Sequence, residues 1–356
     1  MAKFACMNEQ NLIFFIYGLC TMFHGMMVWF FLRKGPDRLS RLVALMMGVV
    51  CAQCVKDMVF YDYGVVQGGL SWMIMTAWDM TVVPIYAAIL IELCKPGMLS
   101  WRSFCVHELF FVLSAALLSC TGEKVWYDVE TVGCAIYGSY WFVWTIFAIP
   151  RYNKALKEQF SYDDNINLDW LRKILYAFFF ILTLWIVGCV YGVTLFDCLH
   201  LVMSMVVWMI ICYFIYQHES VVKDLRRPHD DMAVMAGGET VEESVSDTVG
   251  AKINELFAVD RIYLNPRLKL SDIVRMAGSN RTYVSQWFNR DPQSSFYDYV
   301  NNLRVEHACS LLRNTADSLA MIAEESGFNS LSTFHRVFSS KKGMTPSEYR
   351  SREGGA

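Results

Sequence analysis

The sequence predicts an all-α protein, in which a polytopic bundle of seven transmembrane helices precedes a soluble helical domain with two helix-turn-helix units. Charged residues make up only 18% of the 356 residues, whereas a typical soluble protein has roughly a quarter. Apolar runs recur through residues 1–217, and about 20 helical residues cross a bilayer core. Short amphipathic segments that repeat after residue 251 favour a separate soluble domain.

Seven apolar runs have the length and composition of transmembrane helices. We predict spans at 12–32, 42–60, 70–93, 104–120, 132–149, 174–192 and 198–216. The loops on one side of these spans hold 11 Lys and Arg residues, and those on the other side, with the N-terminal tail, hold only Lys3 and Lys124. Because basic residues accumulate in cytoplasmic loops, we expect the N-terminus outside and the C-terminus in the cytoplasm.

Three ionisable residues, Lys56, Asp57 and Asp79, lie inside the predicted spans. Charges at membrane depth are costly, so they point to a functional site or to a structural pair. Lys56 and Asp79 lie at similar depths in neighbouring spans, which predicts an ion pair. We keep both interpretations open, a structural pair and a signal site formed by these residues.

The composition divides the chain into three regions. A membrane domain of expected sensor function covers 1–217, an acidic linker covers 218–250, and a soluble helical domain covers 251–356. The linker has 3 basic and 8 acidic residues, which is typical of a flexible tether. A partial helix that pairs two protomers is the alternative.

The C-terminal region contains a repeat. Segments 270–278 and 319–327 share apolar residues at helical spacing and end in Gly278 and Gly327, as expected for a helix followed by a tight turn. A second short helix follows each turn, which makes a helix-turn-helix unit. The apolar stripes predicted for these second helices are Val284, Trp287 and Phe288, and Leu331, Phe334 and Phe338.

The tandem arrangement resembles the DNA-binding domain of the AraC/XylS family of bacterial transcription regulators. The resemblance runs from Lys252 to Arg350 and is most specific over 322–338, 342–350 and the connecting-helix motif at 299–304. It implies that the polar faces of the two second helices read bases in successive major grooves. The expected base-reading residues are Arg281, Thr282, Ser285, Gln286, Ser332, Thr333 and Arg336. For Arg304, His335, Lys341 and Lys342 we expect contacts with the DNA backbone or structural roles.

Together these features predict a membrane-embedded one-component transcription regulator in a bacterial inner membrane, with its reading domain in the cytoplasm. Its expected partners are promoter or operator DNA, the lipid bilayer, a second copy of the chain, RNA polymerase and an unidentified signal ligand or membrane partner. We expect no enzyme activity, catalytic residue, cofactor or metal site. A transporter-like membrane protein that sequesters or releases a fused DNA-binding domain is the alternative, and proteolysis in the linker is a further route to release.

Overall fold

The computed structural model describes residues 2–35, 37–61, 69–164, 166–177, 194–218, 242–290 and 295–353. Within these ranges the regular structure is helical, and the one extended contact is an isolated bridge between Phe160 and Lys269. The chain divides into two compact units, Met1–Pro150 with Leu168–His218, and Arg151–Asn167 with Glu219–Ala356. Residues 151–167 were expected in the membrane domain, but they pack with the C-terminal unit.

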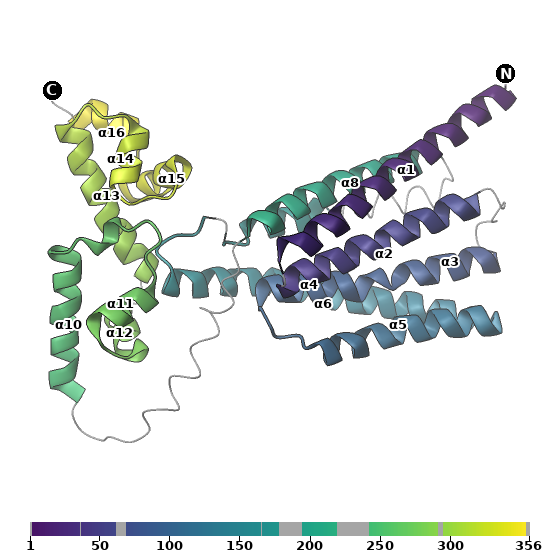
Figure 1. The fold of residues 1–356 in the computed structure, drawn as a ribbon, viewed down its shortest axis with the longest axis horizontal. Helices are drawn as coiled ribbons and strands as arrows, with labels where there is room; N and C mark the ends of the chain where they lie inside the picture. The colour runs from purple at the N-terminus through teal and green to yellow at the C-terminus, as the bar shows by residue number, and fades with distance from the viewer. Residues whose placement is uncertain are drawn as a thin grey trace. The chain divides into compact units, whose positions relative to one another are not determined.

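The first unit consists of long apolar helices (Figure 1). They are α1 (Ala2–Lys34), α2 (Arg38–Tyr61), α3 (Leu70–Met80), α4 (Val82–Cys94), α5 (Trp101–Thr121), the greater part of α6 (Lys124–Gln159) and α8 (Thr194–Gln217). Helix α1 packs against α2 and α8, α2 packs against α4, and α3 packs against α5. Buried Ile13, Ile16 and Cys20 of α1 lie in one cluster with Cys54 and Cys198.

Six helices in the described ranges are long and apolar enough to cross a membrane. They cover Asn11–Lys34, Arg38–Phe60, Leu70–Cys94, Trp101–Thr121, Lys124–Gln159 and Cys198–Gln217. Six of the predicted spans fall within them. The span predicted at 174–192 lies for the most part outside the described residues, so the count of seven stays a prediction.

The third candidate span consists of two helices, α3 and α4, which meet at Thr81. Pro84 lies in the first turn of α4. Because proline has no backbone N–H, it cannot donate to the carbonyl one turn earlier, and it is tolerated best at a helix start. The break therefore follows from the sequence, although we predicted one continuous span.

The second unit is built around two hydrophobic cores joined by one long helix, α13. Its helices are α10 (Glu242–Ala258), the short 3₁₀ helix η1 (Ile262–Leu264), α11 (Leu270–Ala277), α12 (Arg281–Phe288), α13 (Phe296–Asn314), α14 (Leu319–Glu325), α15 (Leu331–Lys342) and α16 (Pro346–Glu353). The first core includes Ile253, Ile273 and Val284, and the second includes Ile322 and Phe334. Each core therefore supports one pair of short helices.

Two details of this unit differ from the sequence predictions. Helix α10 begins at Glu242, inside the segment expected to be a tether, and Val249 belongs to the first core. Leu331 was expected in the apolar stripe of its helix, but its side chain is 42% exposed. Leu331 is the first residue of α15, and the core is filled instead by Phe334, Val337 and Phe338 from the following turns.

Candidate nucleic-acid interface

The first pair of short helices, α11 and α12, is joined by a tight turn. Gly278 ends α11 with φ 62°, in the left-handed region that glycine adopts at low cost. Asn280 caps α12, because its side chain accepts a hydrogen bond from the backbone N–H of Tyr283 at 2.9 Å. Val284 and Phe288 turn inward into the first core. The opposite side of α12 is therefore available for a partner.

Of the predicted reading residues of α12, Thr282 and Gln286 lie on this outward side, whereas Arg281 and Ser285 lie nearer the core-facing side. Thr282 and Gln286 are exposed, and Arg281 and Ser285 are partly exposed. The Ser285 hydroxyl oxygen accepts a hydrogen bond from the Asn289 side chain at 3.3 Å. The structure thus presents all four predicted residues on the surface of one helix.

The turn of the second pair is fixed by close packing. Gly327 follows α14 with φ 80°, and a Cβ atom there would lie 2.7 Å from the backbone oxygen of Leu264. The Asn329 side chain donates to the Pro266 carbonyl at 2.9 Å. Ser330 then caps α15 by accepting from the Thr333 N–H at 3.2 Å. The entry into α15 is therefore held against the loop that precedes α11.

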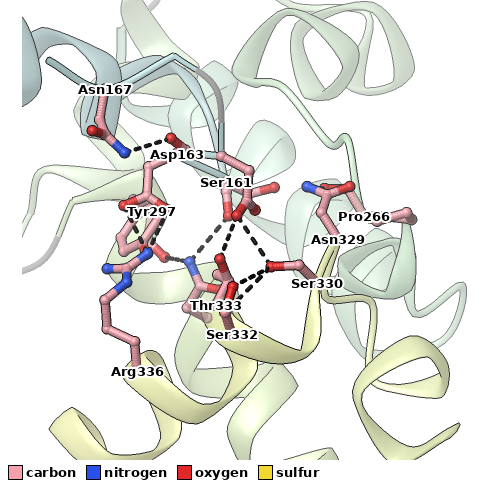
Figure 2. Close-up of polar contacts among 12 residues, drawn as sticks. Ser161, Asp163, Asn167, Pro266, Tyr297, Asn329, Ser330, Ser332, Thr333 and Arg336 are labelled. Atoms are coloured by element: carbon pink, nitrogen blue, oxygen red, sulfur yellow. Dashed lines mark hydrogen bonds and ion pairs between the residues drawn. The ribbon is translucent and has the colours of Figure 1, made fainter. Parts of the chain in front are cut away.

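The outward face of α15 contacts an acidic segment from the same unit, as Figure 2 shows. One guanidinium nitrogen of Arg336 donates to both carboxylate oxygens of Asp163, at 2.7 and 2.9 Å. The hydroxyl groups of Ser330 and Thr333 both donate to Asp164, the former at 3.2 Å. Two of the three predicted reading residues of α15 are therefore occupied.

The two charged groups of this contact, Asp163 and Arg336, are compensated to different degrees. Burial raises the pKa of Asp163, and the neighbouring Arg336 only partly opposes this rise. Burial by itself lowers the pKa of Arg336, but Asp163 and Tyr297 together more than offset that, so the pKa of Arg336 lies above its usual value. Arg336 therefore stays cationic in the contact, and its side chain remains 56% exposed.

Comparison with known proteins identifies the region that carries these helix pairs. Residues 273–352 match a protein-family model for a helix-turn-helix domain. The uncharacterized transcriptional regulator YobQ of Bacillus subtilis is 32% identical over 88 residues, which is 25% of this chain and 36% of YobQ. We refer to residues 273–352 as the helix-turn-helix domain after this match. No solved structure matches the chain.

Other relatives of the helix-turn-helix domain are also named as regulators. YesN, an uncharacterized transcriptional regulatory protein of Bacillus subtilis, is 37% identical over 95 residues, 26% of each protein. The transcriptional activator RhaR of Mannheimia succiniciproducens is 31% identical over 102 residues, 29% of this chain and 37% of RhaR. The similarity therefore covers between 26% and 37% of each of these three relatives.

The predicted basic residues of the helix-turn-helix domain lie in several environments. Lys341 and Lys342 at the end of α15 pair with Asp298 at 3.1 Å and with Glu306 at 2.6 Å, both on α13. His335 is partly exposed. These two ion pairs hold α15 against α13, so both lysines have a structural partner in this arrangement.

Arg304 is the residue whose setting differs most from a DNA contact. It is 1% exposed and donates to the carbonyls of Tyr263 and Asn265, each at 2.7 Å, and of Ser161 at 2.9 Å. Of the two roles expected for Arg304, this geometry supports the structural one. The side chain ties together α13, the loop after η1 and the segment that contains Ser161.

Sequence reasoning missed Ser161, Asp163 and Asp164 altogether. They lie more than a hundred positions before α15, between two predicted membrane spans, and two adjacent aspartates form no recognisable motif. The N-cap Ser330 was also missed, although a serine directly before an apolar helical pattern is a known start signal.

The predicted ionisable cluster of the first unit is present. The Nζ atom of Lys56 lies 2.6 Å from Oδ1 of Asp79 and 3.1 Å from Oδ1 of Asp57. Lys56 also donates to the Met75 carbonyl at 3.1 Å. The predicted Lys56–Asp79 pair is confirmed, and it joins α2 to α3.

Proposed function

We propose that this chain is a membrane-embedded one-component transcription regulator whose AraC-type domain binds specific DNA under the control of the membrane helices. One observation carries the proposal: a helix-turn-helix domain and six helices long and apolar enough to span a bilayer occur in the same chain. The regulator names of the relatives apply to those proteins, and they support this proposal by analogy.

The side-chain distribution of the first unit supports a membrane location. Large apolar side chains point outward from several of its helices, including Phe15, Val106, Ile136 and Phe147 at 69%, 67%, 67% and 63% exposure. Exposing so much apolar surface to water is unfavourable, whereas it is compatible with lipid. We place the protein in a bacterial inner membrane with its N-terminus outside, in keeping with the distribution of Lys and Arg.

We assign sequence reading to two helices, α12 and α15. An α-helix fits the major groove, where glutamine can bind adenine and arginine can bind guanine with two hydrogen bonds each. Gln286 of α12 is exposed and suited to this role, as is Arg336 of α15 once Asp163 is displaced. Two reading helices in one domain would contact two successive major grooves.

The remaining partners follow from the same proposal. The Lys56, Asp57 and Asp79 cluster is our candidate signal site, because charges in an apolar bundle mark functional positions. Two copies of the chain held in one membrane would bind a two-part operator with higher avidity. RNA polymerase is the partner through which a bound regulator would change transcription.

The test is a selection of genomic fragments with the full-length protein in lipid nanodiscs, followed by measurement of affinity for a selected site and for random DNA. Gln286→Ala should weaken binding to the selected site by about 1–3 kcal/mol and relax the preference at one base pair. The matched control is Asn254→Ala, an exposed amide on α10. Failure to enrich any sequence, or equal loss on selected and random DNA in Gln286→Ala, would refute sequence-specific reading.

A further inference from the structure

Residues 160–164 and 166–167 belong to a segment that docks on the helix-turn-helix domain, and this segment has two parts of different character. The first part is an anchor. Phe160 is fully buried, and Ser161 is bound to Leu268, because its N–H and its hydroxyl both donate to the Leu268 carbonyl, at 3.1 and 2.8 Å. Arg304 and Asn301 of α13 both donate to the Ser161 carbonyl. The anchor is therefore part of the folded unit.

The second part is an acidic tip formed by Asp163 and Asp164. It turns back on itself, because the Asp163 carbonyl accepts from the N–H and the side chain of Asn167 at 3.3 and 2.9 Å. The tip presents its carboxylates to α15, and Figure 2 shows this for Asp163. These contacts involve only the side chains of the two aspartates.

The acidic tip binds the same side-chain groups of α15 that DNA would bind. The Arg336 guanidinium holds both oxygens of Asp163 with one nitrogen, and the same group is suited to guanine or to a phosphate. The Thr333 hydroxyl is bound to Asp164, and the Thr333 side chain is only 7% exposed. A base edge and the acidic tip cannot occupy these groups together.

The tip is held less well than its anchor. Oδ2 of Asp164 is buried and has no hydrogen-bond partner in the described part of the structure, and a buried polar atom without a partner is costly. The raised pKa of Asp163 shows that its burial, too, is incompletely compensated. The tip could therefore leave α15 while Phe160 and Ser161 stay in place.

We propose that Asp163 and Asp164 form an autoinhibitory plug that covers the reading face of α15 and must be displaced before DNA binds there. This inference rests on the proposed function, since it concerns the regulation of the same reading face. Helix α6, which contains a candidate membrane span, ends at Gln159, immediately before the anchor. A change in α6 would thus act on the residues that hold the plug.

The first experiment compares full-length variants in lipid nanodiscs. Asp163→Ala/Asp164→Ala removes the plug's side chains and keeps the backbone carbonyl that closes its turn. The matched control, Asp260→Ala/Glu324→Ala, removes two exposed acids from the same unit. If the plug covers α15 about nine-tenths of the time, the plug variant should bind the selected site about tenfold more tightly than wild type. The control should change affinity less than twofold.

Hydrogen exchange on the wild-type chain provides a test that needs no variant. Adding the selected DNA should increase exchange at 162–167 and decrease it along α15. Protection of α15 with unchanged exchange at 162–167 would overturn the plug, as would equal affinities of the plug variant and the control variant. Both of these results leave the proposed function intact if Gln286→Ala still loses specific binding. Absence of specific binding in every variant would instead refute the proposed function, and the plug with it.

Discussion

At the scale of single residues, Arg304 shows how a cation is accommodated in a protein core by uncharged oxygens. Burial lowers the pKa of its guanidinium to about 10, and nearby Tyr297 and Asp164 oppose this change. Arg304 thus remains charged at neutral pH, and its planar fork reaches the carbonyl oxygens of Tyr263 in η1 and of Ser161 in a distant segment. Lysine has the same charge but no such fork.

We therefore expect Arg304→Lys to destabilise the second unit by about 2–4 kcal/mol, because several buried carbonyls lose their donor. The measurement is the rate of thiol labelling of Cys309, which is 1% exposed on the same helix, at increasing urea concentration, read by peptide mass spectrometry. Arg313→Lys, at an exposed position of α13, is the control. Equal urea midpoints of Cys309 labelling in Arg304→Lys and Arg313→Lys would show that the planar guanidinium of Arg304 is not needed for stability.

At the scale of elements, the turns that follow α11 and α14 require glycine for different reasons. Gly278 and Gly327 both have positive φ, at 62° and 80°. A Cβ on Gly278 would have only the flexible end of Lys252 nearby, at 3.9 Å, whereas one on Gly327 would meet the backbone of Leu264 at 2.7 Å. The second turn is therefore constrained by packing as well as by conformation.

Alanine substitutions should distinguish the cost of the left-handed backbone conformation from the cost of close packing. Gly278→Ala should cost about 1–2 kcal/mol, which is the usual penalty for a left-handed residue with a side chain. Gly327→Ala should cost clearly more, because the backbone around Leu264 must also move. Urea midpoints from Cys309 labelling would measure both variants. A smaller loss for Gly327→Ala than for Gly278→Ala would contradict the role of the close approach.

Sequence reasoning succeeded for elements whose signals are local. The repeat with Gly278 and Gly327 placed both short helix pairs, and hydropathy placed six helices, because helical periodicity and turn chemistry depend on nearby residues. It failed for Leu331, because periodicity does not show which residue of a first turn reaches the core. It also missed the docking of Asp163 and Asp164 on α15, because a contact across about 170 positions has no local pattern.

At the scale of the whole molecule, the second unit is assembled from two distant stretches of chain. Residues 151–167 come between predicted membrane spans, yet Phe160 and Ser161 are buried against residues of the helix-turn-helix region and its preceding loop. We therefore expect Phe160, which lies between two predicted membrane spans in the sequence, to contribute to the stability of the second unit.

Phe160→Ala should destabilise the second unit by about 3–5 kcal/mol, the usual cost of removing a buried aromatic ring. In hydrogen exchange on the full chain, the loss should appear as faster exchange in α11 and α13. Phe147→Ala serves as the control, because it removes an aromatic ring from α6, the helix that ends just before Phe160, at a position that is 63% exposed. Unchanged exchange in α11 and α13 would mean that the anchor adds no stability to these helices.

Because two distant stretches of chain form this unit, recombination between genes can separate its parts. A crossover that moved residues 242–353 onto another carrier would leave Arg304 and Asn301 without the Ser161 carbonyl that they share. The transferable module is discontinuous, because it needs 160–167 as well as 242–353. A chimera that inherits both pieces should accumulate as an intact protein in cells, whereas one that inherits the second alone should be degraded.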